Sequence, residues 1–256
     1  MKNKFFYSAV FVAIVISGLL FLPSCSTKIS GPSPEPADSS KVMLAAYYPF
    51  DSNVHDESGN GLNGVATGLD PFPDRHGNIG GAYHFDGVHG FVEIPDNQAL
   101  RLSGTDFTLN AWVLLNSYTA PTILTKRLMP GTNSGWQLSV TNSKAVTPGL
   151  LTYSPGEGGA IAIGKTALSL NIWHMVTCIY KVANNTVHIY VDGTLDNTVS
   201  GISPPSPSVT AKLYIGRDDP TNTSAADFFA GSMDDIRIYG RVISANEVKK
   251  LYQAAQ

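Results

Sequence analysis

The chain has 256 residues, of which 43% are apolar and 14% are charged, and its formal net charge is −3. A disordered chain would be more charged and less apolar, and a helical bundle would be richer in Ala, Glu, Lys and Leu. The mildly acidic balance argues against nucleic acid as a partner, because a basic face is normally needed to displace phosphate counterions. With 24 Gly and 16 Pro breaking the apolar segments, the composition predicts one β domain of roughly 200 residues.

Residues 1–24 have the pattern of an export signal. A short basic head is followed by an uncharged apolar stretch over residues 5–22, and then by Leu22-Pro23-Ser24-Cys25. These last four residues resemble the lipobox of bacterial lipoproteins, in which the Cys is acylated and becomes the first mature residue. The alternative is a transmembrane anchor, since the apolar stretch is nearly long enough to span a bilayer. We expect a lipoprotein signal peptide and a lipidated Cys25 that anchors the protein to the membrane.

A Pro- and Ser-rich segment at residues 25–42 follows the signal. It has few apolar side chains to bury, so it predicts an extended tether that holds a folded domain, residues 43–256, away from the membrane. The expected location is therefore the bacterial cell envelope, with lipid anchoring in the outer membrane. If Cys25 carries lipid, Cys178 has no partner for a disulfide, and its alternating surroundings predict a buried, unreactive thiol.

Alternating apolar residues predict short strands throughout the domain. The pattern occurs at residues 107–113, 173–180, 187–192, 213–216 and 233–239, with Gly, Pro, Asn and Ser clusters between the segments. Many short strands separated by turns favour an antiparallel sandwich, and the sequence lacks the strand–helix alternation that would suggest a parallel sheet.

The one clear helix is expected at the C-terminus. Ser244 and Glu247 have the spacing of a capping box, in which the Ser caps the helix and the Glu reaches back to its amide. Val248, Leu251 and Tyr252 then fall on one side, so the helix should pack across the sandwich.

Eight short blocks of the domain occur in a recognisable order. They are Tyr48-Pro49-Phe50-Asp51 and residues 56–64, 80–87, 107–113, 173–176, 189–193, 214–216 and 231–239. Together they resemble the LamG-like (laminin G-type, pentraxin-like) branch of the concanavalin A-like lectin/glucanase superfamily, over essentially the whole domain. The resemblance implies an all-β jelly-roll sandwich of two curved antiparallel sheets, and the capping box adds a short C-terminal helix.

That superfamily contains both glycosidases and binding proteins, so the fold does not decide the function. Its laminarinase-like glycosidases carry a Glu-x-Asp-x-x-Glu strand, because retaining hydrolysis needs two carboxylates about 5 Å apart on one face. No such strand occurs here, and the adjacent Asp234 and Asp235 are expected to face opposite ways. His174, beside Trp173, is expected to be structural. We therefore expect no catalysis, with a glycoside hydrolase as the least favoured alternative.

Binding of a polysaccharide or another glycan is the favoured function. Sugars are held by aromatic faces and planar hydrogen-bonding side chains, and Tyr118, Trp136 and Tyr153 lie in or beside turn-rich segments. They are the candidate glycan-binding residues, although each could instead only cover the edge of the core. Trp112 and Trp173 lie in strand blocks that the family uses for packing and are assigned to the core. The rival hypothesis is a structural or protein-binding scaffold of the envelope without sugar binding.

The segment from Asp51 to Gly64 is acidic and rich in Asn and Gly. Calcium takes six to eight oxygen ligands from carboxylates, amides and backbone carbonyls, and this loop supplies such groups. The alternative is that these residues only form Asx-type turns. The resemblance implies a structural calcium ion between this loop and the late Asp234. The predicted ligands are Asp51, Asn60 and Asp234, and the first and last strands should then be sheet neighbours.

Overall fold

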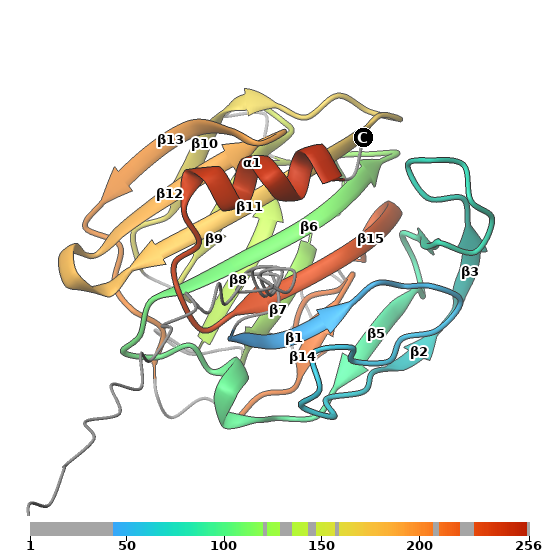
Figure 1. Ribbon diagram of the computed structural model, residues 1–256, viewed down its shortest axis with the longest axis horizontal. Helices are drawn as coiled ribbons and strands as arrows, with labels where there is room; N and C mark the ends of the chain where they lie inside the picture. The colour runs from blue at the N-terminus through green and yellow to red at the C-terminus, as the bar shows by residue number, and fades with distance from the viewer. Residues whose placement is uncertain are drawn as a thin grey trace, which may run out of the picture. The chain divides into compact units, whose positions relative to one another are not determined.

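Two antiparallel sheets lie face to face in the computed structural model of the protein, which describes residues 43–119, 122–128, 135–142, 147–156, 159–206, 210–220 and 228–254 (Figure 1). These residues all belong to one compact unit, residues 38–256. The two antiparallel sheets and the C-terminal helix confirm the predicted all-β jelly-roll sandwich. The predicted signal peptide, tether and Cys25 lie outside the described residues.

The first sheet, sheet A, has eight strands, and the second, sheet B, has seven. Sheet A follows the order β13 (Thr194–Ser200), β12 (Thr186–Val191), β11 (Trp173–Lys181), β6 (Phe107–Leu115), β15 (Ala230–Tyr239), β4 (Ala82–Asp86) and β3 (Leu69–Phe72), and β1 (Leu44–Tyr48) also pairs with β15. Sheet B follows the order β10 (Ala162–Ala167), β9 (Leu150–Ser154), β8 (Gly135–Val140), β7 (Thr122–Arg127), β14 (Leu213–Ile215), β5 (Phe91–Ile94) and β2 (Val65–Thr67). The helices are α1 (Ala245–Ala254) and the short 3-10 helices η2 (Gln98–Leu100) and η3 (Val182–Asn184).

The core between the sheets follows from the alternation of the strands. In β6, Phe107, Leu109, Ala111 and Val113 all point inward and are fully buried. Sheet B supplies matching inward side chains from each of its central strands. Because burial of a large apolar side chain stabilises the fold by about 1.5–3 kcal/mol, this alternation fixes which residues of each strand face outward.

The first and last strands of the domain are neighbours, as the sequence predicts. In Figure 1, β1 lies directly beside β15, and the two strands pair antiparallel, with Leu44 opposite Tyr239 and Tyr48 opposite Ile236. The start and the end of the domain are thereby held in one sheet.

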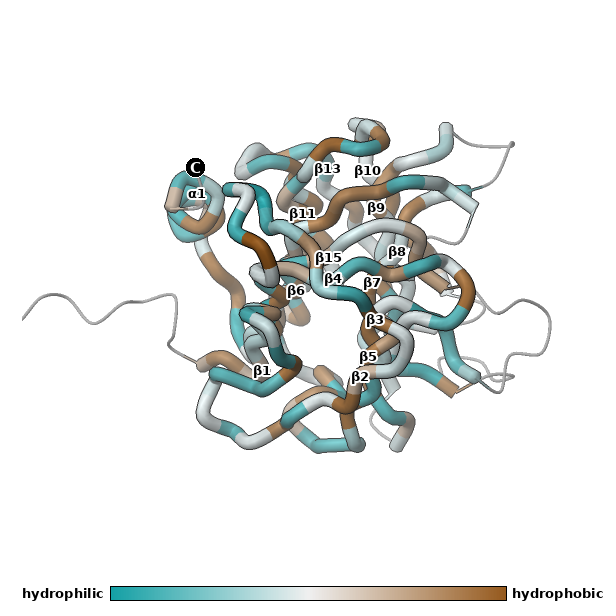
Figure 2. The backbone as a smooth tube through the Cα atoms, turned by 90° about the vertical axis from the view of Figure 1, so that its right-hand side faces the viewer, coloured by the Kyte–Doolittle hydropathy of each residue, from teal (hydrophilic) through white to brown (hydrophobic). Residues whose placement is uncertain are grey.

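Helix α1 packs on the outer face of sheet A. Its capping box is confirmed, because the Ser244 amide donates to Glu247 Oε2 (2.7 Å) and the Glu247 amide donates to Ser244 Oγ (3.2 Å). Val248 of α1 is fully buried in a second apolar cluster with Trp112 and other residues of sheet A, and the Trp112 ring stacks on Tyr252, with centroids 5.7 Å apart. Figure 2 shows α1 on the side of sheet A away from sheet B.

Two further sequence predictions concern burial. Cys178 is a free thiol and fully buried, which confirms the predicted burial. Burial also raises the pKa of the thiol, so it is held in the less reactive protonated form. Trp112 is buried, but under α1 rather than between the sheets. Trp173 is only half-buried, so its assignment to the core is wrong; it packs against the rim of the second cluster.

Among the described helices, none is both long and apolar enough to cross a membrane.

Candidate functional site

The outer face of sheet B carries a continuous row of mainly polar side chains. In β14, Leu213 and Ile215 point into the core, so Tyr214 between them points outward. Cross-strand pairing extends this position in both directions across the sheet. From β2 to β9, the row consists of Val65, Glu93, Tyr214, Thr125, Gln137 and Ser154.

Hydrogen bonds between side chains hold this polar face in place. Gln137 Nε2 donates to Thr122 Oγ1 (3.0 Å), and the hydroxyls of Ser139 and Thr152 lie 2.8 Å apart. Gln137 and Thr152 are only 9% and 8% exposed. An amide and several hydroxyls are thus fixed on one face before any ligand arrives, which lowers the entropy cost of binding.

The carboxylates on this face are bound to cations. Asp218 Oδ1 accepts from Arg127 Nε (2.9 Å) and Asp218 Oδ2 accepts from Arg127 Nη2, so both carboxylate oxygens are engaged. Glu93 Oε1 accepts from Lys212 Nζ (2.5 Å). A retaining glycosidase needs one carboxylate free to attack and another free to donate a proton. The paired Asp218 and Glu93 do not provide that arrangement.

An aromatic cluster adjoins the polar row where β14 ends. The Arg217 guanidinium carbon lies 4.7 Å from the ring centroid of Phe91, 4.8 Å from that of Phe228 and 5.5 Å from that of Tyr214. Gly216 positions Arg217 by a φ of +82°, and a Cβ at Gly216 would lie 2.4 Å from the Phe85 ring. Only glycine fits this turn.

Tyr214 lies where the polar row meets this aromatic cluster. Burial, together with the charge of Glu93 and a hydrogen bond to it, raises the pKa of Tyr214 to about 12. The Tyr214 hydroxyl therefore stays protonated at physiological pH.

Two of the three aromatic residues predicted to bind sugar are in the core. Trp136 and Tyr153 are fully buried; Trp136 Nε1 donates to the Leu100 carbonyl (2.9 Å), and the Tyr153 ring lies 5.7 Å from that of Phe107. Their prediction as exposed sugar contacts is wrong, because each occupies an inward position of its strand. Tyr118 is half-buried and its hydroxyl donates to the Leu168 carbonyl (2.6 Å); its role in glycan binding stays a prediction.

Asp234, a predicted calcium ligand, binds an arginine. Arg75 Nη1 donates to Asp234 Oδ2, and Arg75 Nη2 donates to Asp235 Oδ2 (2.9 Å). The expectation that the two carboxylates face opposite ways is wrong, because the register of β15 shifts between Asp234 and Arg237, and Asp235 has a φ of +52°. Burial and the charge of Asp235 raise the pKa of Asp234 to about 8, against the lowering effect of Arg75. Arg75 also lies over the Trp112 ring at 4.8 Å, so one arginine contacts both carboxylates and the ring.

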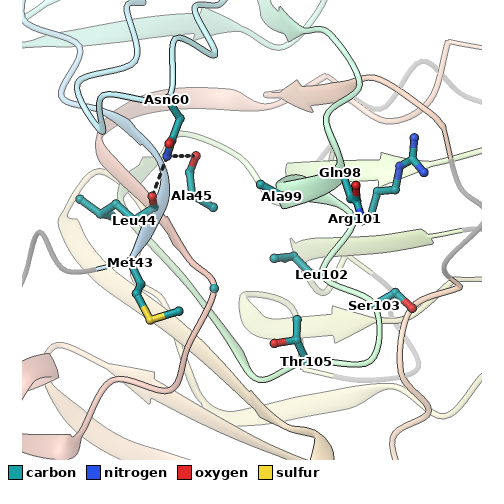
Figure 3. A pocket seen from close by; sticks show the side chains of 11 residues that line it. Met43, Leu44, Ala45, Asn60, Gln98, Ala99, Arg101, Leu102, Ser103 and Thr105 are labelled. Carbon is teal, nitrogen blue, oxygen red and sulfur yellow. Dashed lines mark hydrogen bonds between the residues drawn. The ribbon is translucent and has the colours of Figure 1, made fainter.

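Asn60 lies apart from Asp234. Its Nδ2 donates to the carbonyls of Leu44 (2.8 Å) and Ala45 (3.2 Å) at the start of β1, as the dashed lines of Figure 3 show. Leu44 pairs with Tyr239, which is five residues beyond Asp234. At about 3.3 Å per residue along a strand, this separates Asn60 from Asp234 by roughly 15 Å.

Asp51 is exposed and lies near the Arg75 cluster. Partial burial, followed by the charges of Asp235 and Asp74, raises its pKa. Within the described residues, no three His, Cys, Asp or Glu side chains gather in a way that could hold a metal ion. Because Asn60 lies apart from Asp234, the three predicted ligands do not meet around one ion, and calcium binding stays a prediction.

The loop that was expected to bind calcium is organised by Asp56 instead. The Asp56 carboxylate accepts from the amides of Tyr47 (3.0 Å), Ser58 (3.0 Å) and Leu62 (2.9 Å). These bonds lower its pKa against the effect of burial. Asp56 thus behaves as the alternative hypothesis expected, because its carboxylate binds nearby backbone amides as in an Asx-type turn.

A cavity of about 500 Å³ opens beside Asn60, at the edge where β1 begins (Figure 3). Its lining includes Met43, Leu102, Thr105 and Gln98 but no aromatic side chain. Arg101 points away from it in Figure 3 and binds Asp96. The cavity therefore lacks a surface on which a sugar ring could stack, and the outer face of sheet B is the better candidate site.

The comparisons with known proteins agree with this fold. A laminin G-type family model, described as the concanavalin A-like lectin/glucanases superfamily, matches residues 86–249. Domain 4 of AbnA, a GH43 extracellular arabinanase from Geobacillus stearothermophilus solved in complex with arabinotriose, is similar with a TM-score of 0.65 and 20% identity; the match covers 82% of this chain and 98% of that domain. No curated protein matches the chain in sequence.

Two toxin structures are also similar. The binding domain of Paraclostridial Mosquitocidal Protein 1 gives a TM-score of 0.63 with 18% identity, over 84% of this chain and 52% of that chain. Botulinum neurotoxin type C, whose cell entry depends upon interaction with two ganglioside molecules, gives 0.62 with 15% identity, over 86% and 53%. This chain thus spans about half the length of the toxin chains, and the likeness concerns the fold alone.

Proposed function

We propose, since the chain belongs to the concanavalin A-like lectin/glucanases superfamily, that it is a non-catalytic protein that binds a glycan on the outer face of sheet B. The observation that carries this proposal is the polar row across the sheet, in which Gln137 and its neighbours are held by side-chain hydrogen bonds. Sugar hydroxyls both donate and accept hydrogen bonds, and amides, hydroxyls and the protonated Tyr214 complement them. One or two bound sugar rings would give micromolar to millimolar dissociation constants, about −8 to −4 kcal/mol.

The structural neighbours support this proposal at the level of the fold. Domain 4 of the arabinanase was solved with arabinotriose, so a sandwich of this kind can hold a short sugar chain. The paired carboxylates Asp218 and Glu93 support binding without hydrolysis. A protein-binding scaffold is the second candidate, and it predicts that no glycan binds at all.

A pair of glutamine variants tests the location of the site. Gln137 is on the outer face of sheet B, and Gln98 lines the cavity beside β1. The full chain in detergent is screened on a glycan array, and the affinity for the best ligand is then measured by titration. Gln137→Ala should weaken binding about tenfold, the loss of one or two good hydrogen bonds. Gln98→Ala should leave it unchanged.

Other outcomes would contradict the proposal. If Gln98→Ala weakens binding and Gln137→Ala does not, the cavity is the site. If the array shows no ligand, the scaffold hypothesis replaces glycan binding. Reducing ends released from a bound polysaccharide by the wild-type chain would contradict the non-catalytic part.

We also propose that Cys25 is lipidated and anchors the protein in the bacterial cell envelope, at the outer membrane. The support is the Leu22-Pro23-Ser24-Cys25 motif and the buried, unpaired Cys178. Cys25→Ser should move the protein from the membrane fraction to the soluble fraction. If the variant stays membrane-bound through residues 5–22, a transmembrane anchor replaces the lipid.

A further inference from the structure

Arg217 differs from every other arginine of the domain. Of the six arginines in the described residues, five form ion pairs with carboxylates and Arg217 forms none. Its one hydrogen bond runs from Nε to the Asp218 carbonyl (3.2 Å). The five pairs are Arg75 with Asp234 and Asp235, Arg101 with Asp96, Arg127 with Asp218, Arg237 with Asp235, and Arg241 with Glu247.

The guanidinium of Arg217 is nevertheless held in a fixed place. It packs against the rings of Phe91, Phe228 and Tyr214, at 4.7, 4.8 and 5.5 Å from their centroids. Arg217 is half-buried. A guanidinium has five N–H donors, and the four on its two Nη atoms have no acceptor in the described part of the chain. The Nη donors of Arg217 are therefore held in place, and no acceptor within the described residues binds them.

Neighbouring carboxylates do not supply this partner. Asp218, next in sequence, has both oxygens on Arg127, and Glu93 binds Lys212. Asp219 is 5% exposed and forms no ion pair with Arg217. Because the nearby acids Asp218 and Glu93 are neutralised by other cations, the positive charge of Arg217 is left to act on a ligand.

The position of Arg217 connects it to the proposed glycan site. Its guanidinium contacts Tyr214, which occupies the middle of the polar row on sheet B. A sugar chain bound along that row would pass the Nη donors of Arg217. Guanidinium groups bind planar carboxylates with two parallel hydrogen bonds and also bind other oxyanions.

We infer that the glycan is acidic and that Arg217 binds a carboxylate or a sulfate ester carried by its sugar rings. This inference rests on the proposed glycan site and specifies its ligand class. The aromatic rings leave the guanidinium half-buried, and a partly buried charge interacts more strongly with an oxyanion than a fully exposed one does. The three rings serve to hold Arg217 rather than to stack on sugar.

Matched polysaccharides test this inference with the full chain in detergent. Polygalacturonate is compared with its methyl-esterified form, and dextran sulfate is compared with dextran, by titration calorimetry at low and at moderate salt. Wild-type protein should bind at least one anionic polymer about tenfold or more tightly than its neutral counterpart. Preference for polygalacturonate identifies a carboxylate as the recognised group, and preference for dextran sulfate identifies a sulfate ester.

Three variants localise the effect. Arg217→Met should lose about tenfold or more of the affinity for the anionic polymer and nothing for the neutral one. Arg217→Lys, which keeps the charge but not the fork, should bind with intermediate affinity. Lys249→Met removes the same charge from the exposed surface of α1 and should bind like wild type. Melting curves confirm that each variant is folded, and if Arg217→Met does not fold, Arg217→Lys alone must show the loss.

The failure of this inference is distinguishable from failure of the proposed function. Equal binding of the anionic and neutral forms overturns the role of Arg217 but leaves glycan binding intact. Equal losses in Arg217→Met and Lys249→Met indicate unspecific attraction and also overturn it. If neither these polymers nor any glycan on the array binds, the proposed function itself fails.

Discussion

The outer faces of the two sheets are built by the same strand alternation but are used differently. On sheet A, the outward Trp112 is 3% exposed and lies under α1, where its ring stacks on Tyr252. On sheet B, the outward residues include hydroxyls, the amide of Gln137 and Tyr214, and hydrogen bonds join Gln137 to Thr122 and Ser139 to Thr152. One outer face is thus a second core closed by a helix, and the other is a polar layer, with Thr125, Tyr214 and Gln137 at 0%, 7% and 9% exposure, that we propose as the glycan site. The comparison shows that what covers a face, rather than the fold, decides its role.

Two arginines repeat this contrast at the level of single residues. Arg75 lies 4.8 Å from the Trp112 ring and binds two carboxylates, so its charge is satisfied within the protein. Arg217 lies against three rings and binds no carboxylate within the described residues. Both guanidinium groups pack against aromatic rings, and they differ in whether a carboxylate of the protein binds them. An arginine with its own carboxylates stabilises the fold, whereas one without them can recognise an anion.

The largest effect is expected from removing the indole under α1. Trp112→Ala should lower the free energy of unfolding by about 3–5 kcal/mol, because a buried Trp is lost and a cavity remains. Chemical denaturation measures this loss. Glycan affinity should stay unchanged under conditions in which the variant is folded. Trp173→Ala, at a half-buried position of the same face, is the control and should cost clearly less. A folded Trp112→Ala variant that no longer binds glycan would contradict the assignment of glycan binding to sheet B and of packing to sheet A.

A smaller loss of stability is expected from the buried ion pair of Lys126 in sheet B, which lies away from the proposed glycan site. Lys126 of β7 has a fully buried side chain, and its Nζ donates to Asp96 Oδ1 (2.5 Å) and to the Ala211 carbonyl. Asp96→Asn leaves the ammonium without its counter-ion and should lower the free energy of unfolding by about 3 kcal/mol. Glycan binding should not change, because this charge is closed off from the outer face.

The same ion pair predicts a pH dependence. The hydrogen bond from Arg101, and then Lys126, hold the pKa of Asp96 below its ordinary value. The pair therefore stabilises the protein fully above the ordinary Asp pKa, near 4, and loses this contribution as the pH falls through the lower folded value. Denaturation at several pH values should show a steeper acid loss in wild type than in Asp96→Asn. Equal slopes would mean that Asp96 does not support Lys126.

Much of the fold could be predicted from the sequence because its signals are local. Residues 107–113 alternate cleanly and become β6, and the capping box of Ser244 and Glu247 begins α1 as expected. The same alternation also predicts which residues of the proposed site face outward. In β8, Trp136 and Leu138 share the inward face, so the intervening Gln137 had to point outward. Proximity to turn-rich segments was a weaker guide than strand parity.

The rest of the site depends on contacts that no local pattern reveals. Arg217 meets Phe91 only because β5 pairs with β14 in sheet B. Asp234 and Asp235 share Arg75 because β15 is irregular between Asp234 and Arg237 and Asp235 adopts a positive φ. A register shift of this kind changes which face a side chain occupies. Sequence alternation alone therefore gives the wrong direction for one of the two carboxylates.

The most direct measurement of the central claim is an NMR titration of the full chain in detergent with an oligosaccharide chosen from the glycan array. The account predicts that amide shifts move in β14, β7, β8 and β9 of sheet B, around Tyr214 and Gln137, while α1 and the residues around Trp112 stay unchanged. Shifts confined to α1 and sheet A, or to the cavity beside Asn60, would contradict it.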